Sequence, residues 1–78
     1  MNEFKIDRRI DLKGVPCPLN FVKTKLTLEG MDAGLILEVL LDDGEPIINV
    51  TASVKEEGHQ ILKVDKIFEH WKLVIKRQ

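Results

Sequence analysis

A dense apolar run near the middle of the chain limits what this sequence can fold into. The run from Leu35 to Leu41 reads LILEVLL and is bounded by Gly34 before it and by Asp42, Asp43 and Gly44 after it. A short apolar segment with turn residues at both ends is typical of a buried strand. We therefore predict a central strand here, covered on both sides for part of its length.

Two segments have the spacing of amphipathic helices. The first runs from Pro18 to Glu29 and ends at Gly30, and its predicted buried face carries Leu19, Val22 and Leu26, with Phe21 and Leu28 fitting less well. The second runs from Glu45 to Glu57 and ends at Gly58, and its predicted buried stripe is Ile47, Val50 and Val54. Glycine just past a periodic segment is a common helix stop, which supports both assignments.

Alternation of apolar and polar residues predicts three further strands: 6–12, 60–67 and 70–77. The last two are joined by a tight turn at Phe68 and Glu69, and Trp71, Leu73 and Ile75 share one face of the final strand. The resulting order is βαβαββ. Because crossovers between parallel strands are right-handed, both helices should cover the same face. We predict a two-layer α/β sandwich with a mixed four-stranded sheet.

Length and composition narrow the classes of function. A chain of 78 residues suits a single domain, here residues 1–78, and we expect a monomer. Twelve basic against thirteen acidic residues give a net charge of −1, which disfavours a dedicated nucleic-acid binder. One cysteine, with no signal peptide and no apolar membrane span, favours a soluble protein of the cytoplasm, a reducing compartment.

The single cysteine, Cys17, lies between Pro16 and Pro18. Each proline disfavours the helical conformation in the residue before it, and Pro18 fits the first helical position. We therefore predict that Cys17 is the N-cap of the first helix. There the free N–H groups and the helix dipole would stabilise a thiolate. The alternative is that Cys17 is only a small cap or an inert buried residue.

The stretch from Asp11 to Leu62 strongly resembles the TusA-like, or SirA-type, family of sulfur-carrier proteins. The shared features are a strand and glycine leading to Cys17-Pro18 at a helix start, a lysine on that helix, the strand ending in Asp42-Asp43, and Gly-His after the second helix. The family fold is the same βαβαββ sandwich.

This resemblance implies a sulfurtransferase in the broad sense. Cys17 would accept a sulfane sulfur as a persulfide from a cysteine desulfurase or a rhodanese and relay it to an acceptor protein, with no metal or organic cofactor. Family members serve tRNA thiolation, molybdenum cofactor maturation and sulfur oxidation. Pro18, Leu19 and Asn20 would form the helix start that supports the thiolate.

One residue departs from the family pattern. The usual motif is Cys-Pro-x-Pro, whereas this chain has Cys17-Pro18-Leu19-Asn20. Proline at the fourth position would remove a backbone N–H, so we hypothesise that Asn20 restores this donor and gives the Cys17 sulfur an extra hydrogen bond. The alternative is that Asn20 is simply a tolerated polar residue in the first turn.

Charged residues near Cys17 are candidates for partner docking. Lys13 and Lys23 would attract acidic partners, and Asp42 and Asp43 should lie at the same end of the sheet as Cys17. The alternative for each is an ordinary solvated side chain. His59 should lie at the far end of the domain, and no set of residues has metal-ligand spacing. Two rival functions stay open, an RNA-binding module and a non-catalytic interaction or regulatory domain of the same fold.

Overall fold

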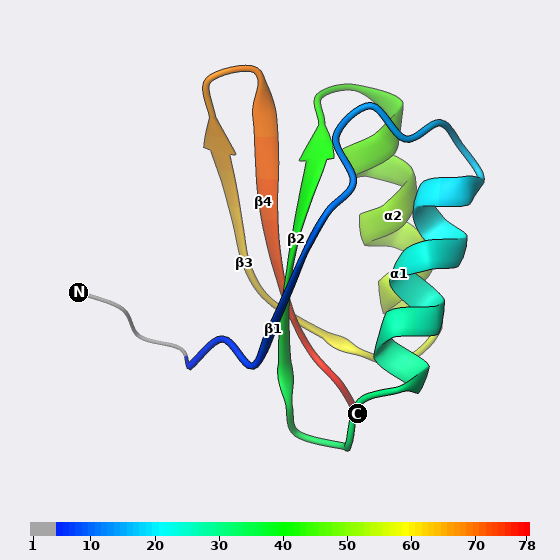
Figure 1. Cartoon of the computed structure of the whole chain (residues 1–78), viewed down its shortest axis with the longest axis vertical. Helices are drawn as coiled ribbons and strands as arrows, with labels where there is room; N and C mark the ends of the chain where they lie inside the picture. The colour runs from blue at the N-terminus through cyan, green and yellow to red at the C-terminus, as the bar shows by residue number, and fades with distance from the viewer. Residues whose placement is uncertain (1–4) are drawn as a thin grey trace.

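A mixed sheet forms one layer of the molecule, and two helices cover one of its faces (Figure 1). A computed structural model describes residues 5–78. The elements in chain order are β1 (Arg8–Asp11), α1 (Leu19–Glu29), β2 (Ile36–Asp42), α2 (Glu45–Glu56), β3 (Gln60–Ile67) and β4 (His70–Lys76). The predicted βαβαββ sandwich is confirmed. The first strand is shorter than predicted, although the Asp7 N–H still donates to the Ile36 carbonyl at 2.9 Å.

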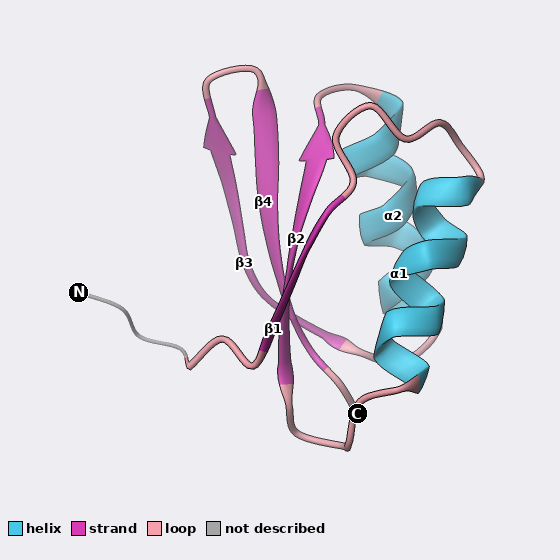
Figure 2. Cartoon of the chain, viewed as in Figure 1, coloured by secondary structure: helices cyan, strands magenta, loops and turns pink. Residues whose placement is uncertain are grey.

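The strand order across the sheet is β1-β2-β4-β3 (Figure 2). β1 pairs in parallel with β2, from Arg8 opposite Leu37 to Asp11 opposite Leu40, while β4 runs antiparallel to both of its neighbours. Parallel neighbours need a crossover connection, and α1 provides it. The carboxyl ends of β1 and β2 therefore meet at the same edge of the sheet.

The core lies between the sheet and the two helices, with α2 contributing a full apolar stripe. The predicted stripe of α2 is confirmed, since Ile47, Val50 and Val54 are all buried. They pack in one cluster with alternate residues of β2 and β4, namely Leu37, Val39, Leu41, Leu73 and Ile75. Trp71 is half-buried against the same cluster, as its place on this face predicted.

The prediction that the central strand is covered on both sides is wrong. Alternate residues of β2 are half-buried on the open face of the sheet, among them Ile36, Glu38 and Leu40. On this face Arg9 Nε donates to Glu38 Oε2 at 3.0 Å. Lys72 Nζ lies 3.9 Å from the other Glu38 oxygen. The apolar run thus reflects one buried face and one face whose leucine and isoleucine pack beside charged neighbours.

The predicted buried face of α1 is wrong for its main residues, although Phe21 and Leu28, which fitted that face less well, do pack into the core. Its buried residues are Asn20, Thr24 and Leu28, with exposed fractions of 0%, 0% and 2%, whereas the expected stripe of Leu19, Val22 and Leu26 is exposed. Burial of the two polar residues is tolerated because their polar groups have partners. Thr24 Oγ1, for example, donates to the Asn20 carbonyl at 2.9 Å. We call the exposed residues Leu19, Val22 and Leu26 the α1 stripe.

Two leucines in α1 test this orientation. Leu28→Ala should lower the free energy of unfolding by about 2 to 5 kcal/mol, because it leaves a cavity in the core. Leu26→Ala should change it by less than about 0.5 kcal/mol, because Leu26 is mostly in solvent. Urea unfolding followed by tryptophan fluorescence measures both. Equal losses for the two variants would contradict the orientation of α1.

Candidate functional site

The loop between β1 and α1 is fastened to the carboxyl end of β2. Leu12 N donates to the Leu40 carbonyl at 2.9 Å, and Gly14 N donates to Asp42 Oδ2 at 2.7 Å. Gly14 has a φ of +79°, a conformation that side-chain-bearing residues rarely adopt. Asp42, predicted as a docking residue, thus has a structural contact that holds the loop leading to Cys17.

Cys17 is exposed and lies directly before the first turn of α1. The prediction that it is the N-cap is wrong. The N-cap is instead Pro18, which we predicted to be the first helical residue. Pro18 has φ −92° and ψ 9°, and the Cys17–Pro18 peptide bond is cis. The Pro16 carbonyl accepts the Asn20 N–H at 3.1 Å, so a backbone oxygen takes a first-turn donor that a capping side chain would use.

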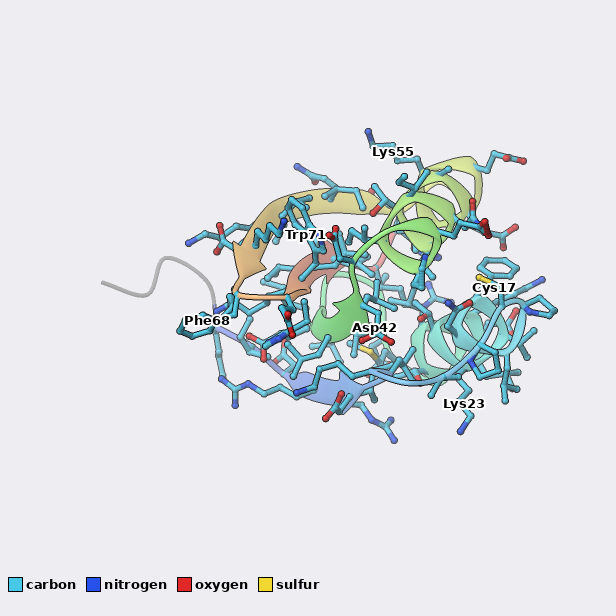
Figure 3. The ribbon with its side chains drawn as sticks, turned by 90° about the horizontal axis from the view of Figure 1, so that it is seen from above. Cys17, Lys23, Asp42, Lys55, Phe68 and Trp71 are labelled. Atoms are coloured by element: carbon cyan, nitrogen blue, oxygen red, sulfur yellow. The ribbon has the colours of Figure 1, made fainter. Side chains whose placement is uncertain are left out.

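Two side-chain carboxamides reach the Cys17 sulfur. Asn20 Nδ2 donates to Sγ at 3.3 Å, and Asn49 Nδ2, from the second turn of α2, lies 3.8 Å from the same atom. Asn20 Oδ1 also accepts the Phe21 N–H at 2.6 Å, which fixes the orientation of its amide. Cys17 is therefore held between the amino-terminal parts of two helices, and Figure 3 shows it in that position.

The predicted hydrogen bond from Asn20 to the Cys17 sulfur is confirmed, but its donor is a different group from the predicted backbone N–H. The extra hydrogen bond to the sulfur exists, but it comes from the side chain, since the backbone N–H donates to Pro16. The Asn20 side chain is fully buried, with 0% exposure. Sequence reasoning missed Asn49, although its place near the start of α2 put it at the same edge of the sheet as Cys17.

Four of the remaining predicted site residues are exposed, namely Lys13, Pro18, Leu19 and Lys23. Pro18 and Leu19 begin α1 and are exposed. Lys13 and Lys23 are exposed as well, Lys13 with a loose ion pair to Asp11 at 3.9 Å. Figure 3 shows Lys23 directed outward from α1.

Asp43 instead binds other side chains of this protein. Its Oδ1 accepts a hydrogen bond from Trp71 Nε1 at 2.7 Å, and its Oδ2 lies 3.6 Å from Lys66 Nζ. The hydrogen bond from Trp71 holds the pKa of Asp43 below its usual value of 3.8, and the positive charge of Lys66 lowers this pKa by a smaller amount. Asp43 therefore ties the turn before α2 to β4.

His59 lies at the opposite end of the molecule from Cys17, as predicted. Its Nδ1 accepts the backbone N–H of Gln78, and Figure 1 shows the carboxyl terminus far from the loop that precedes α1. Within residues 5–78, no group of three or more His, Cys, Asp or Glu side chains is gathered closely enough to hold a metal ion. Neither α1 nor α2, the helices of that range, has the length and apolarity that a membrane crossing requires.

The surface has a groove on each side of the helical layer. The α1–β1 groove has a volume of ≈ 500 Å³ and is lined by Ile10, Asp11, Leu12, Lys23, Leu26 and Thr27. The α2–β3 groove, of ≈ 450 Å³, is lined by Ile47, Ile48, Thr51, Ala52, Lys55, Val64 and Trp71. Cys17 lines neither of these two grooves, and its side chain is exposed.

The fold and the site define a small α/β protein that presents one exposed thiol at the edge of its sheet. Residues 8–77 match the family model of the sulfurtransferase TusA. A putative sulfur carrier protein of Archaeoglobus fulgidus is 41% identical over 88% of this chain and 80% of its own length. The sulfur carrier protein TusA of Allochromatium vinosum is 30% identical over 73% and 75% of the two chains.

A solved structure agrees with these sequence matches. The crystal structure of a SirA-like protein from Desulfitobacterium hafniense superposes with a TM-score of 0.75 and 26% identity, over 88% of this chain and 95% of that one. The chain therefore belongs to the TusA family of sulfur-carrier proteins, as the sequence resemblance indicated.

The contact between Asp43 and Trp71 predicts that the stability of the fold falls at acid pH. Because the folded protein favours the Asp43 carboxylate, this contribution to stability is present above about pH 4 and is lost as the pH falls through the lowered pKa. Trp71→Phe should raise the pKa of Asp43 toward 3.8, as measured by NMR titration of the carboxyl carbon. Lys66→Gln, which leaves the hydrogen bond, should raise it less. Identical titrations in all three proteins would contradict this role for Trp71.

Proposed function

We propose that this protein carries a sulfane sulfur as a persulfide on Cys17 and transfers it to an acceptor protein. The observation that supports this proposal is an exposed cysteine whose sulfur accepts hydrogen bonds from two carboxamides, in a chain of the TusA sulfur-carrier family. The thiolate is the nucleophile in sulfur exchange, and the two amides hold the Cys17 sulfur at an exposed position from which it can attack.

The transfer needs no oxidant or reductant beyond the two partner proteins. The Cys17 thiolate attacks the outer sulfur of a donor persulfide, forming a new S–S bond while the donor's S–S bond breaks and its electron pair stays on the donor cysteine. The proton of the outer sulfur moves with it. The acceptor's thiolate then attacks that sulfur, and the electron pair of the broken bond returns to Cys17 Sγ.

A cysteine desulfurase or a rhodanese is the donor class that we propose. The donor would dock on the α1 stripe and the adjoining α1–β1 groove. The start of α1 lies close to Cys17, and the stripe is unusually apolar for the solvent-exposed face of a helix. Lys23 would supply attraction to an acidic donor surface. Asp42 and Asp43 would contribute through the structure of the site rather than by contact with the donor.

Mass spectrometry of the intact protein tests the persulfide. After incubation with cysteine and a cysteine desulfurase, the wild type should gain one sulfur atom that a reductant removes, and Cys17→Ser should gain none. Serine is the matched control because its hydroxyl still accepts the Asn20 hydrogen bond. No gain from a desulfurase or from a loaded rhodanese would contradict the proposal. RNA binding that is salt-sensitive and unaffected by Cys17→Ser would instead favour the rival binding module.

Charge reversal tests the docking surface. Lys23→Glu should slow sulfur transfer from the desulfurase by about threefold or more at low ionic strength, and the difference should shrink as salt is added. The matched control is Lys55→Glu, an exposed lysine of α2 that Figure 3 shows on the other side of the molecule from Lys23. Equal slowing in the two variants would place docking elsewhere.

A further inference from the structure

We propose that Asn49 is a positioning residue for the carried sulfur atom itself, while Asn20 serves the Cys17 sulfur. This inference rests on the proposed persulfide function. It assigns different steps of the transfer to two carboxamides that reach the same atom from different helices.

The two amides differ in distance and burial. Asn20 is fully buried, and its Nδ2 lies 3.3 Å from Sγ. Its amide orientation is fixed, because Oδ1 accepts the Phe21 N–H and the Asn20 carbonyl accepts the Thr24 hydroxyl. Asn49 is exposed, and its Nδ2 lies 3.8 Å from Sγ, a loose contact for a hydrogen bond to sulfur.

The longer distance suits a persulfide better than a thiol. An added sulfur lies about 2 Å from Sγ, so a terminal sulfur on the α2 side comes within hydrogen-bond reach of Asn49 Nδ2 without any backbone movement. Because Asn49 is exposed, its side chain can follow a terminal sulfur that projects toward the solvent. Asn20, which is buried, cannot follow the terminal sulfur outward and stays with Sγ.

This division assigns a separate effect to each side chain. Asn20 stabilises the electron pair that returns to Sγ when the acceptor removes the outer sulfur, because that pair makes Sγ a thiolate again. Asn49 donates to the terminal sulfur in the loaded state and so favours loading over loss. Asn49 also selects one orientation of the S–S bond, which presents the outer sulfur at the face between α1 and α2.

Asn49→Ala is the informative variant, because Asn49 is exposed and its replacement should leave the fold intact. We expect the loaded fraction at equilibrium with a low-molecular-weight persulfide donor to fall, with the loading constant reduced by about threefold to tenfold. Alkylation of the unloaded thiol by iodoacetamide should change by less than about twofold, since Asn20 remains in place. Ser53→Ala, one turn further along α2, is the matched control and should change neither quantity.

The outcomes separate this inference from the proposed function. A loading constant that is unchanged in Asn49→Ala, or a fall in loading matched by an equal fall in alkylation, would overturn the role of Asn49. If the wild type forms no persulfide with any donor, the proposed function fails and this inference fails with it. Asn49→Asp, which replaces the donor by a charged acceptor of the same shape, should lower the loading constant further than alanine does.

Discussion

Parallel pairing of β1 with β2 is the constraint on which the site depends. It requires a crossover, and α1 as that crossover has to begin at the edge where both strands end. The loop carrying Cys17 therefore leaves β1 beside the end of β2, where the Asp42 carboxylate accepts the Gly14 N–H. Since α2 follows β2 directly, its first turns reach the same edge and bring Asn49 to the sulfur. One pairing thus gathers the loop and both helix starts around a single thiol.

The buried face of α1 links the stability of the helix to the state of this thiol. Asn20 has no exposed surface, and the described structure gives its amide nitrogen the Cys17 sulfur as acceptor. A buried donor that loses its acceptor costs about 1 to 3 kcal/mol. The sulfur is accordingly a structural acceptor as well as a reactive atom. These two roles of the sulfur explain how a polar residue can be buried in the first turn of α1, on the face that packs into so small a core.

Much of the fold could be predicted from the sequence, because the apolar stripe of α2 matches the residues that this helix buries, and the alternation near the end of the chain located the strands β3 and β4. The orientation of α1 could not. Apolarity alone favoured Leu19, Val22 and Leu26, while the buried positions of Asn20 and Thr24 depend on hydrogen bonds to a sulfur and a carbonyl that exist only in the folded chain. The sequence placed Cys17 just before the first helix, as observed, but the prediction that it is the N-cap was wrong. The Pro16 carbonyl accepts the Asn20 backbone N–H, which a capping side chain would otherwise have accepted. Asn49 lies 32 residues from Cys17, and no local pattern connects them.

The exposed α1 stripe also has a kinetic consequence. The whole molecule measures only 29 × 28 × 18 Å and exposes 4868 Å². A specific partner typically covers about 800 Å² on each side of an interface. If the proposed donor and acceptor both contact the Cys17 sulfur and the α1 stripe, they cannot be bound at the same time. Under the proposed function, sulfur would then pass through the carrier in a ping-pong order, and a donor that bound too tightly would stop the relay.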